Sequence, residues 1–405
     1  MMGLSLYNAF FAMNDTKKDH CGHEAAKTQA SPNPVAASRC SVPKRHKTGE
    51  SHLNLGALVA LNVVDLKGAS RLSVWWRALR YHYTPPSLFP AVLGATVSWA
   101  VDRAFLPFFF VLAVAGVMIN HLGLNMADDY YDYKHAVDQA KPGEKNPYSG
   151  GSGTLSSGLI APPSMLRAFA ACFCITAAIG LYLAYARGLP VLFFGLFGVF
   201  CSVFYTAPPV SFSHHGFGEL AQLLSFGPVI GLGAYFVQAQ GLSLGAFIAT
   251  FPLGIMLFSM ITINEIPDYS EDRMAGKLTL IARYGRLNGV KLYIASWACT
   301  YAVIAVGLAL QILPVAALLA FLSLPLALRS IARLRANYED PLRMAPANLD
   351  MIRAHGITSM GLIAGYAILG LTGGANAAQL VVILCLLVVL YLPVAIELVK
   401  PHKQS

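Results

Sequence analysis

Long apolar segments recur along the chain from residue 86 almost to its C-terminus. Each is close to the length of about 20 residues that an α-helix needs to cross the hydrocarbon core of a bilayer. The pattern predicts an all-α fold, a polytopic membrane helical bundle without a conventional soluble domain. Ten transmembrane helices are predicted, at residues 86–102, 105–127, 163–186, 190–206, 217–239, 242–264, 287–310, 313–334, 352–372 and 377–398.

The two ends of the chain lack this apolar pattern. Residues 1–70 are mostly polar, and the lysines of the opening MMGLSLYNAFFAMNDTKKDH follow its apolar part, which is the reverse of a signal peptide. We therefore expect an uncleaved, mobile N-terminal extension at 1–70, a transmembrane domain at 71–398 and a cytoplasmic tail at 399–405. The segment RLSVWWRALRYHYTPPS, which opens the membrane domain, is amphipathic and suited to the headgroup layer.

Charged residues are few and lie mainly on one side of the predicted membrane domain. Only 12% of the 405 residues are charged, 56% are hydrophobic, and the formal net charge is +9. The basic residues are scattered through loops and form no stripe with interleaved aromatic residues, so membrane lipid and not nucleic acid is the expected partner. If the N-terminus is cytoplasmic, the outward loops contain only Arg103 and Arg187 as basic residues, and this asymmetry fixes the orientation.

Two acidic clusters stand out in this apolar chain. They are NMADDYYDYKHAVD at 125–138 and NEIPDYSEDRMAGK at 264–277, and each lies where an apolar segment ends on the predicted cytoplasmic side. A carboxylate near hydrocarbon costs several kcal/mol unless a cation meets it. On a helix Asp128 and Asp132 share a face, as do Asp268 and Asp272, and Asn125 and Asn264 lie about one turn earlier.

The oxygen ligands of these clusters favour magnesium. Mg²⁺ is a hard ion that takes one or two carboxylates together with substrate phosphates and water, whereas zinc prefers sulfur and nitrogen ligands, and the side chains aligned here are carboxylates and amides. Two Mg²⁺ sites facing each other across a bundle would hold one diphosphate and stabilise the charge that develops as it leaves. Lys277 is placed to contact the same phosphates as a point charge, and Arg273 is a weaker candidate. The alternative is that these are solvated carboxylates at a cytoplasmic rim.

A glycine-rich segment, NPYSGGSGTLSSG at 146–158, lies in the longest loop of the predicted membrane domain. It is either a flexible linker or a backbone that bends over a bound anion and offers it N–H groups. Its glycines lack the spacing of a phosphate-binding P-loop.

The two acidic clusters resemble motifs of a known family. Residues 125–132 followed by Asp138 resemble the first aspartate-rich motif of intramembrane aromatic prenyltransferases of the UbiA superfamily, and residues 268–280 resemble the second. Within that superfamily they are most similar to the 1,4-dihydroxy-2-naphthoate polyprenyltransferases of menaquinone synthesis. The resemblance covers residues 72–372. It implies nine core transmembrane helices, so the tenth predicted helix is an addition at the C-terminus.

Two more positions match that family, and three features depart from it. Arg80, ahead of PAVLG, stands where the family has an arginine that implies contact with the diphosphate or the acceptor. Tyr205 opens a Tyr-Thr-Ala-Pro-Pro turn whose tyrosine lies near the reacting prenyl carbon in the family; the alternative for it is an interfacial aromatic anchor. Asp128 stands in place of a usual Asn and Pro267 in place of a frequent Arg, and the long N-terminal extension lies outside the common core.

The resemblance implies a Mg²⁺-dependent enzyme of the inner membrane of a prokaryote, with its active site facing the cytoplasm. It would transfer a polyprenyl group from polyprenyl diphosphate to an aromatic acceptor; with dihydroxynaphthoate, prenylation and decarboxylation would give demethylmenaquinone. The tail would lie in an apolar channel open to lipid. The expected metal ligands are Asn125, Asp128 or Asp129, Asp132, Asp138, Asn264, Asp268 and Asp272, the catalytic residues Asp132, Asp268, Asp272 and Tyr205, and the diphosphate-binding residues Lys277, Arg80 and Arg273.

Two other functions compete with this interpretation. A sister prenyltransferase would use another acceptor, such as homogentisate, 4-hydroxybenzoate, a porphyrin or a glycerol lipid. An ion-coupled transporter would instead place its carboxylates near the bilayer midplane, often in broken helices related by a repeat. The clusters here lie at helix ends, which favours the enzyme. The sequence carries no signal for the oligomeric state or the prenyl chain length.

Overall fold

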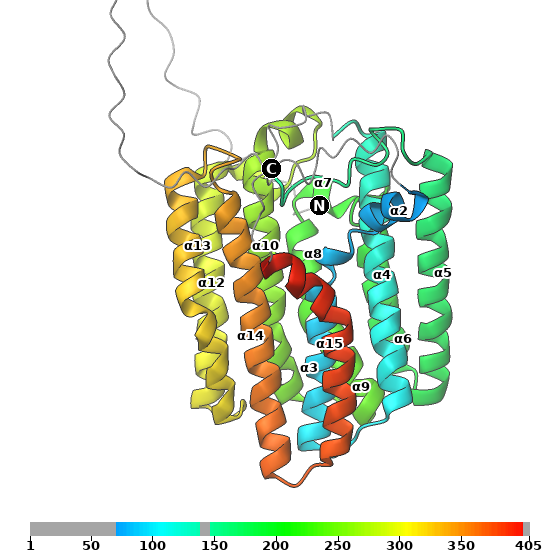
Figure 1. Cartoon of the computed structure of the whole chain (residues 1–405), viewed down its shortest axis with the longest axis vertical. Coiled ribbons are helices and arrows are strands. Elements are labelled where there is room, and N and C mark those ends of the chain that lie inside the picture. Colours follow the sequence, from blue (N-terminus) through cyan, green and yellow to red (C-terminus); the bar gives the residue numbers. More distant parts are fainter. Residues whose placement is uncertain (1–69, 138–145, 400–405) are drawn as a thin grey trace, which may run out of the picture. The chain divides into compact units, whose positions relative to one another are not determined.

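The computed structural model describes residues 70–137 and 146–399, and this part of the chain is helical with no strand (Figure 1). The predicted all-α membrane bundle is confirmed. The elements are α2 (Arg71–Leu79), η1 (Tyr81–Tyr83), α3 (Pro85–Val101), α4 (Pro107–Lys134), α5 (Pro162–Arg187), α6 (Pro190–Val203), α7 (Phe212–His215), α8 (Gly218–Leu224), η2 (Ser225–Val229), α9 (Ile230–Ala239), α10 (Leu244–Met274), α11 (Leu280–Tyr284), α12 (Arg286–Ala309), η3 (Val315–Ser323), α13 (Leu324–Asn337), α14 (Ala345–Thr372) and α15 (Ala377–Val399).

Each predicted transmembrane segment overlaps helical structure. Within the described residues, eight helical segments are long and apolar enough to cross a membrane, two of them continuous through η2 and η3. The other two predicted spans are the shorter helices α3, with 17 residues, and α6, with 14. The predicted extension up to residue 69, Asp138 and the tail from residue 400 lie outside the described residues.

Three helices extend beyond the predicted apolar segments. α4 continues to Lys134 and α10 to Met274, so both acidic clusters lie in the last turns of helices. α14 begins at Ala345, ahead of the predicted residue 352, because its first turns bury polar groups against protein and not against lipid. Asp350 there is 1% exposed and accepts hydrogen bonds from the guanidinium groups of Arg329 and Arg333 at 2.7 to 2.9 Å. The apolar segments in the sequence therefore correspond to the part of each helix in the hydrocarbon layer. The helices themselves are longer, because their backbone hydrogen bonding continues beyond that layer.

The centre of the helical bundle is formed by α3, α10 and α14. In Figure 1, α12 and α13 lie on one side of these helices and α4, α5 and α6 on the other. α3 is buried from Pro85 to Ala100. The indole N–H of Trp99 on this helix donates to the carbonyl of Asn376, 3.1 Å away, which joins α3 to the segment before α15.

A pair of glycines lets α3 approach α9. A Cβ atom added to Gly94 would collide with the backbone carbonyl of Gly231. We expect Gly94→Val to lower the free energy of unfolding by about 1–3 kcal/mol, because neither backbone can yield without separating the helices. The midpoint of thermal unfolding in detergent measures this effect. Gly180→Ala on α5 is the control, since its Cβ would meet nothing within 4 Å; equal midpoints for the two variants would contradict the close packing.

Candidate active site

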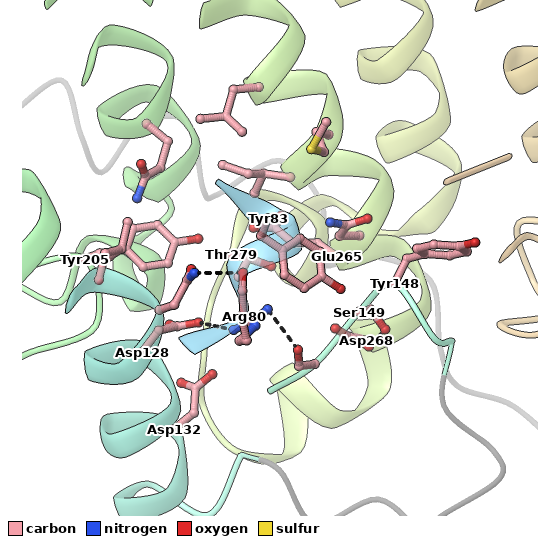
Figure 2. A pocket seen from close by; sticks show the side chains of 18 of the residues that line it. Arg80, Tyr83, Asp128, Asp132, Tyr148, Ser149, Tyr205, Glu265, Asp268 and Thr279 are labelled. Carbon is pink, nitrogen blue, oxygen red and sulfur yellow. Dashed lines mark hydrogen bonds and ion pairs between the residues drawn. The ribbon is translucent and has the colours of Figure 1, made fainter. Parts of the chain in front are cut away.

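One cavity brings the two acidic clusters together (Figure 2). α4 lines it with residues at helical spacing from His121 to Asp132, and α10 lines it with residues from Leu257 to Asp272. The rest of the wall is formed by the end of helix α2, the loop that contains Gly150, the helical segments α8 and η2, and the segments that carry Tyr205 and Lys277. Among the predicted site residues, the cavity is lined by Arg80, Asn125, Asp128, Asp132, Tyr205, Asn264, Asp268, Asp272 and Lys277.

The cavity has a polar end and an apolar end. The carboxylates of α4 and α10 gather at the polar end, near the C-termini of both helices. Toward the interior of the bundle the wall becomes apolar, with Leu124, Phe226, Leu257 and Met260. Leu257 and Asp268 on α10 are about 16 Å apart along the helix axis at a rise of 1.5 Å per residue. The cavity thus combines a charged mouth with a hydrocarbon-lined interior.

Arg80 connects the first acidic cluster to the glycine-rich loop. It adopts the left-handed conformation that ends α2, with φ of 49°. Its guanidinium lies 3.7 Å from the carboxylate of Asp128 and 3.3 Å from that of Asp129, and it donates to the carbonyl of Gly150 at 3.2 Å. Figure 2 shows Arg80 between Asp128 on α4 and the segment that carries Asp268.

The adjacent residues Asp128 and Asp129 have different surroundings. Asp128 lines the cavity, and the Thr206 hydroxyl donates to it at 2.6 Å. Asp129 does not line the cavity and is turned toward the loop, where the backbone N–H of Ser152 donates to both of its carboxylate oxygens at 3.1 Å. Asp128 is therefore the member of the pair that faces the cavity, and Asp129 holds the loop.

Lys277 forms a buried ion pair with the first cluster although it follows the second. Its ammonium lies 2.8 Å from the carboxylate of Asp132, and the two side chains are only 12% and 9% exposed. Burial by itself lowers the pKa of Lys277, but the carboxylates of Asp132, Asp128 and Asp272 outweigh it and hold that pKa well above its ordinary value. Lys277 thus remains a fixed positive charge between the two clusters.

The glycine-rich loop also contacts the second acidic cluster. The Ser149 hydroxyl donates to the Asp268 carboxylate at 2.7 Å. Gly150 and Gly153 have φ values of 76° and 71°, in the left-handed region that glycine adopts without strain, and this lets the loop fold over the mouth of the cavity. The linker interpretation is therefore wrong for the described part of this loop, since it is fastened to both clusters.

Two asparagines that sequence reasoning missed position Asn264. The amide of Asn348 on α14 donates to the Asn264 oxygen at 2.8 Å, and the amide of the fully buried Asn146 donates to Asn348 at 3.1 Å. In the sequence, the only signal for Asn348 was a polar residue just before an apolar segment.

Tyr205 and Arg273, both predicted at the site, lie in different places. Tyr205 lines the cavity, and burial followed by the nearby Glu265 and Asp128 carboxylates raises its pKa well above the ordinary value, which keeps the phenol neutral. The structure does not bring Arg273 to the cavity. Its guanidinium donates to the hydroxyl of Tyr269 at 2.7 Å and lies over the ring of that residue, so the role in diphosphate binding predicted for it has no support.

The donor set of the cavity fits magnesium. Carboxylate and amide oxygens of Asp128, Asp132, Asn264, Asp268 and Asp272 face it. In the part of the chain that the structure describes, no three His, Cys, Asp or Glu side chains are close enough to enclose an ion by themselves. Mg²⁺ needs no such enclosure, because it is commonly bound through one or two carboxylates and completed by phosphate oxygens and water.

Comparisons with known proteins agree with this geometry. Residues 87–352 match the UbiA prenyltransferase family. The chain is 25% identical over 228 residues to 1,4-dihydroxy-2-naphthoate octaprenyltransferase of Bacillus subtilis, covering 56% of this chain and 71% of that one. It is 22% identical over 300 residues to 2-carboxy-1,4-naphthoquinone phytyltransferase of Synechocystis, covering 74% and 94%.

A solved structure shares the fold. A UbiA homologue from Archaeoglobus fulgidus bound to GPP and Mg²⁺ superimposes with a TM-score of 0.54 at 16% identity, over 73% of this chain and 99% of that chain. At this identity the likeness bears on the fold alone. The family match, in contrast, spans more than half of the chain and includes both acidic clusters. The protein therefore belongs to the UbiA prenyltransferase family and is an integral membrane enzyme that transfers polyprenyl groups.

Proposed function

We propose that the enzyme transfers a polyprenyl group from its diphosphate to 1,4-dihydroxy-2-naphthoate, with decarboxylation, to give demethylmenaquinol, the reduced form of demethylmenaquinone. The observation that carries this proposal is the single cavity in which carboxylates of α4 and α10 face each other above an apolar interior. A diphosphate with a hydrocarbon tail has the same division into a charged and an apolar half. The acceptor is inferred from the curated relatives that carry this name, at about 25% identity.

The polar end of the cavity would bind the diphosphate. Asn125, Asp128 and Asp132 on α4 would hold one Mg²⁺, and Asn264, Asp268 and Asp272 on α10 a second; Asp138, predicted as a further ligand, lies outside the described residues. The bound ions would neutralise the charge that develops on the leaving diphosphate. Lys277 and Arg80 would add fixed positive charges at the same place, and Arg80 would also keep the loop around Gly150 over the ligand.

The apolar end would hold the prenyl tail, and Tyr205 would lie near its reacting carbon. Cleavage of the carbon–oxygen bond leaves an allylic cation, which the electron-rich ring attacks before carbon dioxide departs. Tyr205 is suited to this place because its neutral phenol presents a ring face and a hydroxyl to a developing cation without contributing a nucleophilic phenolate. The apolar wall around Leu257 excludes water that would otherwise capture the cation.

We propose from the charge asymmetry that the cavity mouth faces the cytoplasm, and from the resemblance to bacterial relatives that the membrane is the inner membrane of a prokaryote. The mouth lies at the end of the bundle where α4 and α10 terminate, and Lys277, Arg283 and Arg286 follow α10 at that end. The positive-inside rule assigns such an end to the cytoplasm. Cysteine accessibility at Arg283→Cys, compared with Gly241→Cys at the opposite end of α10, tests the assignment.

The acceptor is tested with purified protein, Mg²⁺, a labelled polyprenyl diphosphate and a panel of acceptors. We expect a product from 1,4-dihydroxy-2-naphthoate whose mass shows the gain of one prenyl group and the loss of carbon dioxide. Homogentisate, 4-hydroxybenzoate, a porphyrin and a glycerol lipid complete the panel. Turnover of one of these with dihydroxynaphthoate left unchanged would assign the enzyme to a sister activity.

Removal of divalent metal should abolish turnover reversibly. We expect a chelator to lower the rate by roughly 10²-fold or more, and added Mg²⁺ to restore it, because the charge on the departing diphosphate is no longer neutralised. Inorganic diphosphate should also raise the unfolding temperature only when Mg²⁺ is present, since ligands that bind the native state stabilise it. Full activity in chelator, or stabilisation by diphosphate without Mg²⁺, would contradict the metal-bridged arrangement.

A further inference from the structure

The cavity contains two buried hydrogen-bond acceptors that the roles above do not use. Glu265 on α10 is 9% exposed; its carboxyl interacts with the buried carboxyl of Glu219 on α8, and its Oε2 receives no hydrogen bond from any other described group. Gln222 on α8 is 4% exposed, and its Oε1 is likewise unpartnered there. Both side chains line the cavity. A buried polar atom without a partner is costly, so such atoms at a cavity wall indicate a ligand that supplies the missing donors.

The position of Glu265 along α10 shows at which depth of the cavity a ligand would meet these acceptor atoms. Glu265 lies three residues before Asp268, which places it one helical turn deeper on nearly the same face of α10. It lines the same cavity as Tyr205, the residue proposed to lie near the reacting carbon, and its charge contributes to the raised pKa of that phenol. Figure 2 shows Glu265 between the polar mouth and the side chains further in. This level is the junction of diphosphate and tail, where the second substrate must meet the prenyl group.

The chemistry of the site selects among the possible ligands. A prenyl tail has no donors, and an ionised diphosphate offers only acceptors. Water held on Mg²⁺ also has donors, and the Mg²⁺ requirement measured below separates it from an acceptor hydroxyl. A phenolic hydroxyl has one O–H to donate, and a ring with two hydroxyls has two. We propose that Glu265 and Gln222 form the binding subsite of the aromatic acceptor and accept hydrogen bonds from its ring hydroxyl groups.

This inference rests on the proposed function and makes it more specific, because it requires an acceptor with hydroxyl groups. A subsite that hydrogen-bonds a substrate hydroxyl discriminates strongly against an analogue that lacks it, since the buried acceptor atom is then left unpaired. The competing explanation is that Glu265 is a further metal ligand next to Asn264. The two explanations differ in which substrate depends on Glu265.

The test compares wild type with Glu265→Gln and Gln222→Met, using 1,4-dihydroxy-2-naphthoate and its 4-methyl ether. For Glu265→Gln we expect the acceptor KM to rise by about tenfold or more, while the donor KM and the Mg²⁺ concentration for half-maximal rate stay within twofold. The preference of wild type for the free hydroxyl over the ether should shrink by a similar factor in at least one of the two variants. Equilibrium binding of dihydroxynaphthoate without donor should weaken in parallel.

The control variant is Thr262→Val, which removes a buried hydroxyl without a described partner from the same helix, outside the cavity lining. It should leave both KM values unchanged. A changed donor KM or Mg²⁺ requirement in Glu265→Gln, with an unchanged acceptor KM, would make Glu265 a metal ligand and overturn the inference. Unchanged constants in both cavity variants would also overturn it while leaving the proposed function intact. Failure of wild type to prenylate any hydroxylated ring would overturn both.

Discussion

Asp268→Asn should lower the rate of prenyl transfer by roughly 10²–10³-fold while leaving the protein folded. The substitution keeps the shape of the side chain and its contact with the Ser149 hydroxyl, 2.7 Å away, but removes a negative charge from the second acidic cluster. The predicted loss is of metal and diphosphate affinity and not of core packing, because the cavity side of the residue is lined by polar groups. The rate is measured with saturating donor and acceptor, and folding by the thermal midpoint.

Asp268 is a cleaner choice for this experiment than Asp132. Asp132 is paired with the buried ammonium of Lys277, so its replacement would both remove a ligand and leave that buried charge without its partner. Glu339→Gln is the control for charge, since that carboxylate is exposed outside the cavity; its rate should equal that of wild type. Near-normal turnover by Asp268→Asn would exclude a metal at α10.

The sequence predicted the features of the site that depend on spacing within one helix. The pairs Asp128 with Asp132 and Asp268 with Asp272 follow from the helical period, and each pair faces the cavity. That the two helices end on the same side follows from counting apolar segments between them. Local periodicity and the parity of membrane crossings therefore account for the way the two clusters face each other.

What the sequence left undecided depends on contacts between distant segments. The periodicity of α4 does not distinguish Asp128 from Asp129; the backbone of Ser152, far along the chain, turns Asp129 away from the cavity. Arg273 directly follows Asp272, so its side chain leaves α10 in a different direction. It stacks on the ring of Tyr269 outside the cavity. Asn348 reaches Asn264 only because α14 packs beside α10.

Sequence spacing was least able to predict the pairing of Lys277 with Asp132. This contact also has the largest consequence for the electrostatics of the cavity. Lys277 follows the second cluster but neutralises the first, at 2.8 Å, and it lies near Asp128 and Asp272 as well. One buried ammonium therefore compensates carboxylates from both helices, alongside the Arg80 guanidinium that lies beside Asp128. A bound metal and diphosphate would share this task, with the ammonium placed to contact a phosphate.

Lys277→Met should therefore lower the stability of the protein when magnesium is absent and weaken donor binding when magnesium is present. In chelator, the free energy of unfolding should fall by about 3–5 kcal/mol, because removing one partner of a buried pair leaves the carboxylates uncompensated. Added Mg²⁺ should recover part of that loss by binding between them, and should stabilise the variant more than wild type. With Mg²⁺ present the variant should still turn over, but its donor KM should rise about tenfold or more as a charged contact to diphosphate is lost.

Denaturant unfolding with and without Mg²⁺, together with the donor KM, measures both effects. Lys291→Met on α12 is the matched control, because that ammonium is exposed and contacts only the side chain of Asn288 among the contacts described for it. An unchanged donor KM would remove Lys277 from the diphosphate site even if stability fell. Equal stabilisation of variant and wild type by Mg²⁺ would show that the metal does not bind among the carboxylates that Lys277 compensates, and the two-cluster site would then need a different cation.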